Sequence, residues 1–458
     1  MSVAEPEPEF IAGKHDRAFL GHPKGLGFLA LTEGCERFSY YSMQTLLVLY
    51  MVKYLLVPGR IAGVAGLNWA RDSLWGGLAG QPLASAIFGT YTALVYMTPI
   101  AGGFIADMWL GRRRTLVLGG VVMTLGHFLM AFEGSFLLAL LALIVGVGLF
   151  KGNIASQVGE LYGPTDQRRA MAFQIFYIAI NVSVIIAPLI SGTLGEKVGW
   201  HWGFGAAGVV MALGLLVYLR AGPWLPADNL PVKREQGQRA AWLPGDGARM
   251  AAIMILVPVM ACAMITNQEI FNAYLVWADR SFQLTFFGVT LPTSFMITID
   301  AAFSFSTLVG VAAFWQWWGK TRREPDELAK MILGAAFSIA GGLCLVIAAA
   351  TQGSGKIGLF WPAMFHLLNS LGFSHMLPVS LALFSRLAPK PIEGTVIGIY
   401  YLAFFAANAL VGKVGGMLET VPIVQFWLLH VATAAVAFMA FTLFRLLLAK
   451  RLMGGDAG

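Results

Sequence analysis

Long apolar runs dominate this sequence, and each is long enough to cross about 30 Å of hydrocarbon as a helix. There are twelve of them, at approximately 27–56, 83–107, 114–133, 136–160, 170–194, 201–221, 249–278, 286–318, 328–351, 357–386, 394–418 and 423–449. Because a bilayer offers no water to backbone amides, only helices and closed barrels can span it, and runs of this length indicate helices. The sequence therefore predicts an all-α membrane protein with twelve transmembrane helices.

The composition agrees with this prediction. The chain of 458 residues is 57% hydrophobic and only 12% charged, which excludes a water-soluble globular domain of this length. The net charge of +7 comes from basic residues between the apolar runs, so we expect a lipid bilayer as partner and no nucleic acid. Cys35, Cys262 and Cys344 each lie inside an apolar run, without the spacing of a disulfide framework or a metal site, so no metal is expected.

A proline-rich, basic segment in the middle of the chain divides the helices into six and six. The expected domains are an N-terminal segment (1–26), a first six-helix bundle (27–221), a linker (222–248), a second six-helix bundle (249–450) and a tail (451–458). Most Lys and Arg residues fall on one side when both termini are placed there, so the positive-inside rule predicts cytoplasmic termini. Arg37 and Lys151 lie inside helices instead.

The first apolar run contains a stripe of polar and charged residues. With spacings of i, i+3, i+4, i+7, i+8 and i+11, the following residues share one helix face: Glu33, Glu36, Arg37, Tyr40, Tyr41 and Gln44. An ionisable group inside a bilayer costs at least about 2.5–3.5 kcal/mol, so the stripe must face protein or water and indicates an ion or substrate path. A salt bridge that only fixes helix packing is the alternative interpretation, although desolvation can cancel the Coulombic gain of such a pair.

The architecture of six plus six helices with cytoplasmic ends resembles the major facilitator superfamily of secondary transporters. The segment Gly102–Arg114 resembles the signature loop of that superfamily between helices two and three. In this loop Asp107 can accept hydrogen bonds from basic groups or helix-end amides, and Gly102, Gly103 and Gly111 permit close helix approach, which would latch one gate conformation. A loop that only orients the chain is the alternative. The resemblance implies a substrate site near the midplane, between the two halves.

The segment Glu33–Tyr41 resembles the ExxERFxYY motif of one branch, the proton-dependent oligopeptide transporter (POT) family. Three further matches follow in the family's order: Tyr96 resembles a second-helix tyrosine that contacts peptide, Lys151 a fourth-helix lysine, and Asn181 a fifth-helix asparagine of the substrate site. The resemblance implies proton-coupled symport of di- and tripeptides by alternating access. The sequence has no phosphate-cradling loop and no nucleophile with a placed base, so no enzymatic activity is expected. The family's eukaryotic second-helix histidine is absent, with Gly89 near its place, and no large insertion follows helix nine, which indicates a bacterial inner-membrane protein. We expect no cofactor beyond the proton as coupling ion, and a functional monomer.

The residue chemistry supports a coupling hypothesis. Arg37 and Lys151 are donors suited to a peptide's carboxylate, and Glu33 and Glu36 compete for the same cations. Protonation of one glutamate would release a cation to the substrate, so that proton and peptide favour each other's binding. The candidate substrate-binding residues are Arg37, Tyr40, Tyr41, Tyr96, Lys151, Asn181, Asp300 and Tyr400.

Two departures from the family pattern concern the outer gate. Gln44 stands where the family usually has a second arginine on helix one. On helix seven Gln268 aligns with a family acid, whereas a one-residue shift would select Glu269. If only one of the two family charges were missing, the other would be an unpaired buried ion, so the absence of both charges is self-consistent. A hydrogen bond between Gln44 and Gln268 is a candidate replacement for the missing ion pair. The candidate gate residues are Gln44, Gln268, Glu269 and Asp107.

Two more departures concern the peptide's free amine. On helix ten Phe373 stands where peptide transporters generally have a glutamate, and nearby His366 and His375 are interpreted as packing groups. On helix eight Asp300 stands where the family usually has asparagine, and an aspartate inside the membrane is a functional candidate. We therefore expect Asp300 to take part of the amine-binding or proton-carrying role, while Tyr400 replaces a family tryptophan in an aromatic wall.

Other functions remain open on the sequence alone. A drug or metabolite exporter, or another proton-coupled carrier of the same superfamily, would share the twelve helices and the Asp107 loop. A sensor that binds peptides without transporting them would share the site residues.

Overall fold

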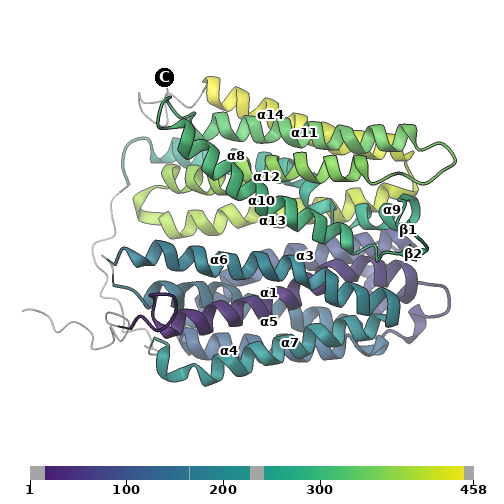
Figure 1. Ribbon diagram of the computed structural model, residues 1–458, viewed down its shortest axis with the longest axis horizontal. Helices are drawn as coiled ribbons and strands as arrows, with labels where there is room; N and C mark the ends of the chain where they lie inside the picture. Colours follow the sequence, from purple (N-terminus) through teal and green to yellow (C-terminus); the bar gives the residue numbers. More distant parts are fainter. Residues whose placement is uncertain (1–15, 164–165, 227–241, 448–458) are drawn as a thin grey trace, which may run out of the picture. The chain divides into compact units, whose positions relative to one another are not determined.

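The computed structural model describes residues 16–163, 166–226 and 242–447, and these form mainly long helices (Figure 1). The long helices are α1 (Lys24–Tyr50), α3 (Gly80–Ile105), α4 (Arg112–Leu129), α5 (Phe136–Glu160), α6 (Arg168–Ala187), α7 (Trp200–Arg220), α8 (Asp246–Glu269), α10 (Phe295–Trp318), α11 (Glu327–Thr351), α12 (Phe360–Leu387), α13 (Glu393–Gly415) and α14 (Ile423–Leu447). Two shorter helices, α2 (Leu67–Leu74) and α9 (Ala273–Ser281), complete the α-helices of the described chain.

Ten helical segments of the described chain are long and apolar enough to cross a membrane. The two remaining long helices carry more charge: α1 contains the charged stripe, and α4 begins with three consecutive arginines at 112–114. With α1 (27 residues) and α4 (18 residues), the described chain has twelve long helices, the number of apolar runs in the sequence.

The prediction that one helix covers 286–318 is wrong at its start. Strands β1 (Thr285–Phe286) and β2 (Val289–Thr290) pair antiparallel there, and α10 begins only at Phe295. Phe287 and Gly288 between the strands have φ of 51° and 78°, and two successive positive φ angles are what a tight two-residue hairpin turn requires. The apolar side chains of the hairpin extend the hydrophobic run, and hydrophobicity alone does not separate a short strand from a helix end.

The predicted helix over 249–278 is interrupted. Helix α8 ends at Glu269 and α9 begins at Ala273, with a turn at 270–272 between them. The Glu269 carboxylate accepts a hydrogen bond from the Ala273 backbone N–H (3.1 Å) and so satisfies one of the free amides at the start of α9. The interruption therefore places an acidic side chain inside the membrane-spanning segment.

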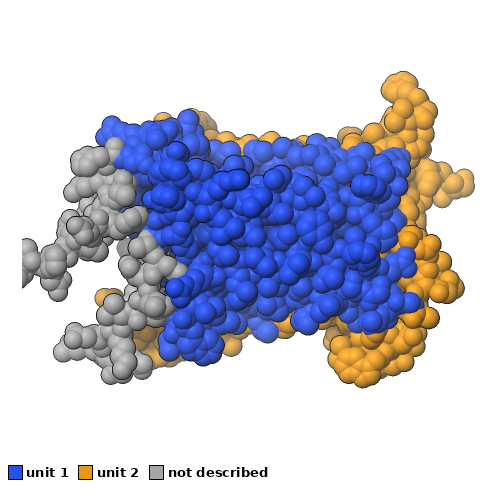
Figure 2. All heavy atoms as spheres, turned by 90° about the horizontal axis from the view of Figure 1, so that it is seen from below, with its two compact units in different colours: residues 1–46, 63–65, 97–235 blue, residues 47–62, 66–96, 236–458 orange. Residues whose placement is uncertain are grey.

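The described chain divides into two compact units (Figure 2). Unit 1 comprises residues 1–46, 63–65 and 97–235, and unit 2 comprises residues 47–62, 66–96 and 236–458. The first part of α3 thus packs with C-terminal helices in unit 2. The six-helix bundles 27–221 and 249–450 remain predictions, and most of the linker 222–248, like the tail 451–458, lies outside the described residues.

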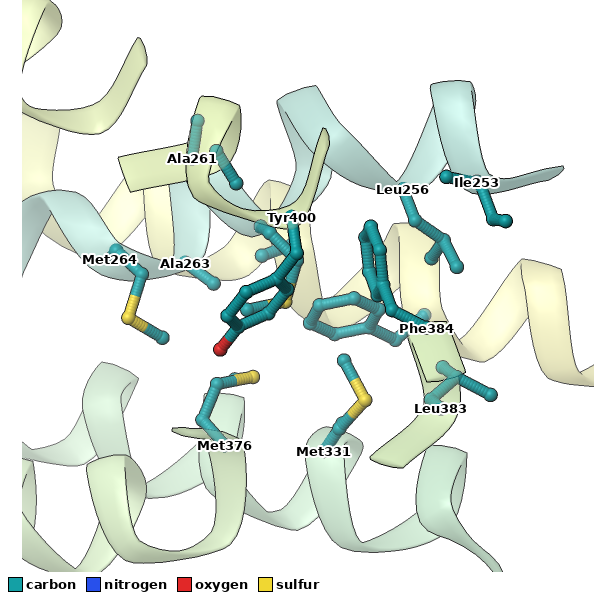
Figure 3. Close-up of a cluster of buried hydrophobic side chains, with 14 of the residues drawn as sticks. Ile253, Leu256, Ala261, Ala263, Met264, Met331, Met376, Leu383, Phe384 and Tyr400 are labelled. Carbon is teal, nitrogen blue, oxygen red and sulfur yellow. The ribbon is translucent and has the colours of Figure 1, made fainter. Parts of the chain in front are cut away.

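Unit 2 has an apolar core between α8, α11, α12, α13 and α14. Figure 3 shows Tyr400 inside it, with Met264, Met376 and Phe384 around the ring. Tyr400 is only 2% exposed. Because lipid tails are as apolar as these side chains, close packing rather than exclusion of water holds such helices together.

Unit 1 uses glycines of the signature loop for packing. A Cβ at Gly102 of α3 would lie 1.9 Å from the carbonyl oxygen of Gly148 on α5, so the two helices touch through backbone atoms. Gly111 has φ of 78°, which favours glycine before α4. A Cβ at Gly103 would meet nothing within 4 Å, so the expectation of close approach is wrong for this residue.

Candidate functional site

The charged stripe of α1 faces protein in unit 1. Glu33, Glu36 and Arg37 are 4%, 0% and 4% exposed. The Arg37 Nε atom lies 2.9 Å from Glu33 Oε1 and 2.5 Å from Glu36 Oε2. Two acids therefore share one guanidinium, and this cluster of three residues is called the ERE cluster below.

The ERE cluster is only partly satisfied. Glu33 Oε2, both carboxylate oxygens of Glu36, and the Nε and Nη2 atoms of Arg37 are buried and have no hydrogen-bond partner among the described residues. A buried polar atom without a partner costs about 1–3 kcal/mol, so native proteins keep few of them. The geometry thus disfavours a purely structural salt bridge, which would use these atoms, and favours a site that receives a proton or a ligand.

Aromatic and basic side chains surround the ERE cluster. The Tyr40 ring centroid lies 5.2 Å from Arg37 Cζ and 6.0 Å from Lys151 Nζ on α5, and Tyr41 packs edge-on against Tyr40 at 5.1 Å. Lys151 is half-buried and interacts electrostatically with the charged groups of the cluster. The structure therefore brings the predicted residues of helices one and four together.

Two other predicted residues of unit 1 have less specific surroundings. The Asn181 side chain on α6 is half-buried, and its Nδ2 donates to the Tyr177 backbone carbonyl of the same helix (2.8 Å). Gln44 on α1 is 2% exposed. Their substrate and gate roles stay predictions.

The signature loop is tied to helix ends by one arginine. Asp107 lies in a π-helical turn, η3 (Ala106–Leu110), that follows α3, and its Oδ1 lies 3.6 Å from Arg112 Nη2 at the start of α4. Arg112 also pairs with Glu160 at the end of α5. Exposed pairs of this kind contribute about 0–1 kcal/mol each, so the arrangement is a weak latch that joins α3, α4 and α5. Sequence reasoning anticipated the acceptor role of Asp107 and missed Glu160.

Asp300 belongs to a buried chain of three side chains in unit 2. Its Oδ1 lies 2.9 Å from His366 Nδ1 on α12, and the other ring nitrogen, Nε2, lies 2.8 Å from the Tyr274 hydroxyl on α9. His366 and Tyr274 are 0% exposed, and Asp300 is 8% exposed. His366 is therefore a buried, satisfied side chain, as expected, although the sequence did not identify Asp300 as its partner. Tyr274 was missed because it meets His366 across 92 residues.

The two gate candidates on helix seven have different partners. Gln268 accepts a hydrogen bond from Asn408 Nδ2 on α13 (3.3 Å) and donates one to Asn267 (3.2 Å). Glu269 is 0% exposed and contacts His430 on α14, with 3.4 Å between Oε2 and Nε2. The chain therefore keeps a buried acid one residue beyond the aligned position, and His430 was missed because no motif marks it.

The aromatic candidates Tyr96 and Tyr400 lie in unit 2 beside one phenylalanine. Tyr96 stacks on Phe404 at 5.1 Å between ring centroids, and Tyr400 meets the same ring edge-on at 5.6 Å. The Tyr400 hydroxyl lies 3.1 Å from Ser380 Oγ. Tyr400 is thus part of the core, and its contact with substrate stays a prediction.

Comparison with protein families and curated proteins supplies relatives over nearly the whole length. The family model described as the POT family matches residues 113–230. An uncharacterized transporter of Bacillus subtilis, YclF, is 30% identical over 89% of this chain and 90% of its own length. The peptide transporter YePEPT of Yersinia enterocolitica is 29% identical over 87% of this chain and 89% of its own length. A di-/tripeptide transporter of Lactococcus lactis is 29% identical over 90% of this chain and 93% of its own length.

Solved structures show the same architecture. The crystal structure of a peptide transporter, POT, in complex with sulfate superposes with a TM-score of 0.84 at 25% identity, covering 97% of this chain and 99% of that protein.

Proposed function

Because this chain belongs to the POT family of membrane transporters, we propose that it imports di- and tripeptides together with protons. Two relatives named as transporters of peptides, from Yersinia and Lactococcus, match it over nearly their whole length. The single observation that carries the proposal is the ERE cluster, in which two buried acids share Arg37 while one terminal guanidinium nitrogen, Nη2, has no hydrogen-bond partner among the described residues. Import is proposed across a bacterial inner membrane, with cytoplasmic termini and a functional monomer.

Coupling would arise from competition for Arg37. An ionised glutamate holds the guanidinium by the attraction of opposite charges, and a protonated one holds it more weakly because that attraction is lost. Once released, Arg37 can take the substrate's carboxylate, with Lys151 as a second cation near the same tyrosine ring. Proton and peptide would then increase each other's affinity by equal factors, as linkage requires. No cofactor besides the proton is needed for this cycle.

The Glu33→Gln and Glu36→Gln variants test this coupling. Each is expected to lose accumulation of peptide driven by a proton gradient and to retain peptide exchange across the membrane, because glutamine keeps the shape and cannot titrate. The measurement is transport of labelled di-alanine into proteoliposomes, once under a proton gradient to follow accumulation and once without a gradient to follow exchange. Glu324→Gln is the control, since that glutamate side chain is 44% exposed and pairs with Lys330 outside the cluster. Preserved accumulation in both variants would contradict the mechanism.

The amine-binding role of Asp300 is proposed on its position inside the membrane-spanning helix α10 and on its hydrogen bond with His366 (2.9 Å). A charge-assisted hydrogen bond to a peptide amine contributes about 1.5–3 kcal/mol, so Asp300→Asn is expected to weaken binding of peptides with a free N-terminus about 10- to 100-fold. N-acetylated peptides should bind equally well to both forms. Asp279→Asn, at a partly exposed ion pair with Lys53, is the control. Unchanged affinity and an unchanged pH profile of uptake would remove Asp300 from the site.

The proposal as a whole is tested by di-alanine uptake under an imposed inward proton gradient, with an ionophore control. Uptake that exceeds the control and is competed by di- and tripeptides supports a proton–peptide symporter. Absence of uptake by folded protein that still binds peptides would favour a sensor, and absence of both would favour a different substrate.

A further inference from the structure

Glu269 and His430 form a buried acid–histidine pair that the proposed mechanism does not use. We propose that these two side chains are a second proton-binding site, at the interruption between α8 and α9, whose occupancy is tied to the packing of α3 against α13 within unit 2. The inference rests on the proton coupling proposed above and adds a specific site to it.

The hydrogen-bond geometry requires a proton between the two side chains. His430 Nδ1 lies 2.9 Å from the Phe426 backbone carbonyl, which can only accept, so Nδ1 carries a hydrogen. The opposite ring nitrogen, Nε2, then has a bare lone pair in the neutral imidazole, and it faces Glu269 Oε2 at 3.4 Å. A carboxylate oxygen and a bare ring nitrogen are both acceptors and repel each other. One added proton, on either atom, converts this contact into a hydrogen bond.

The surroundings of Glu269 locate that proton. Its other oxygen, Oε1, already accepts hydrogen bonds from Asn272 Nδ2 (2.9 Å) and the Ala273 backbone N–H (3.1 Å). A hydrogen on Oε1 would point at the hydrogens of both donors and repel them. The proton therefore lies between Oε2 and His430 Nε2.

Burial makes the protonated pair the stable form in this conformation. Both side chains are 0% exposed. With the proton bound, the pair has no net charge, either as acid and imidazole or as carboxylate and imidazolium. Without it, one negative charge would be buried without a cationic partner, and the desolvation penalty for such a charge is several kcal/mol. Release of the proton therefore requires that water reach the site.

A hydrogen-bond network connects the site to α3 and α13. Asn272 accepts from Ser85 Oγ on α3 (3.0 Å), and Gln81 donates both to Ser85 (2.8 Å) and to the backbone carbonyl of Gly415 on α13 (2.9 Å). A Cβ at Gly415 would lie 2.1 Å from Asn272 Nδ2 and 2.6 Å from Glu269 Oε1. The site is thus closed by the end of α13, and separation of α3 from α13 would open it.

Other titratable groups near the pair have their own partners or lie at the surface. The Asp300–His366–Tyr274 chain is separated from His430 by Trp427, whose ring centroid is 6.3 Å from Tyr274 and 5.0 Å from His430. On α13, Lys413 is exposed. Residues 80–96 of α3 contain no charged residue. The charged residues of α11 and α14 lie near the ends of these helices. Within the described chain, the titratable side chain that Glu269 contacts is therefore His430.

Transport stoichiometry gives the first test. Each coupled proton supports about a tenfold accumulation per unit of pH gradient. His430→Gln is expected to lower steady-state accumulation about tenfold per pH unit and to leave peptide exchange within about twofold of wild type. Glu269→Gln is expected to lower accumulation by the same factor. Glu419→Gln is the control, because that glutamate is exposed and pairs with Arg280. An unchanged proton-to-peptide ratio in both variants would overturn the proposal.

Neighbouring glycines give a matched pair of variants. Gly415→Ala places a methyl group against Asn272 and Glu269 and is expected to lower accumulation as Glu269→Gln does. Gly416→Ala meets only ordinary contacts, 3.5 Å from Pro82, and should behave as wild type. Equal behaviour of the two alanine variants would contradict the network.

A direct measurement separates this inference from the proposed transport. In full-length protein labelled with nitrogen-15 histidine in lipid nanodiscs, His430→Gln identifies the His430 signals among those of seven histidines. The Nε2 signal is expected to be that of a protonated or strongly hydrogen-bonded nitrogen at neutral pH, and to change in Glu269→Gln. A signal of a free, unprotonated nitrogen that is identical in both proteins would overturn the site, even if the wild type transports peptides. If the signal is as expected and di-alanine is not transported, the site stands and the proposed substrate fails.

Discussion

Replacing Arg37 with methionine is expected to abolish peptide uptake and exchange and to destabilise the protein at neutral pH. The guanidinium lies 2.9 Å and 2.5 Å from two carboxylates that are almost completely buried. Removing one partner of a buried ion pair typically costs about 3–5 kcal/mol, because the remaining charge has no compensation. Here two acids would remain, so the cost should lie at the upper end of that range.

The pH dependence of this variant follows from the same charges. Without Arg37, the folded form must bind protons at Glu33 and Glu36 to keep them neutral, whereas the unfolded form leaves them ionised at neutral pH. The folded state then binds more protons, so stability should rise as pH falls. The measurement is the melting temperature of purified protein across a pH series. Arg386→Met is the control, since that arginine pairs with Glu327 at the surface. If Arg37→Met melted at the same temperature as the wild type at neutral pH, the cluster would not be charged as described.

Replacing Gly102 with alanine is expected to produce the largest loss of stability among glycine variants of unit 1. The new methyl group would lie 1.9 Å from the Gly148 carbonyl oxygen and 3.0 Å from Leu149 Cα, so helices α3 and α5 must separate. Backbone atoms cannot rotate away as a side chain can, and overpacking usually costs about 1–3 kcal/mol. We expect the upper end of this range, measured as a lower melting temperature in detergent.

Gly103→Ala is the matched control for this prediction. It adds the same methyl group to the same helix one residue later, where nothing lies within 4 Å. Alanine also has a higher helix propensity than glycine, so a small gain in stability is expected at this position. Equal losses in the two variants would mean that helix propensity or lipid contact, rather than close approach of α3 to α5, governs this segment.

Much of the fold could be predicted from local sequence. Runs of about twenty apolar residues have to be helices in a bilayer, which is why the helices α5 and α7 begin and end at or next to their predicted residues. The stripe on α1 could be predicted for a related reason. Helical spacing places Glu33, Glu36 and Arg37 on one face, and the cost of charge in lipid requires that this face be covered.

Partners from distant parts of the chain could not be predicted in this way. His366 meets Asp300 across 66 residues, and His430 meets Glu269 across 161. Each histidine, considered alone, lies in an apolar helix with no motif around it. Only the packing of α12 against α10, and of α14 against α8, makes these histidines partners of acids.

The sequence by itself thus determined which segments are helices, which face of α1 carries charge, and which family the chain resembles, because bilayer solvation acts on each helix separately. The tertiary structure decided where helix seven breaks, where α10 begins, and which buried acids have a histidine beside them. Those features depend on side chains and turns that meet only when the helices pack. No periodicity along a single helix can encode them.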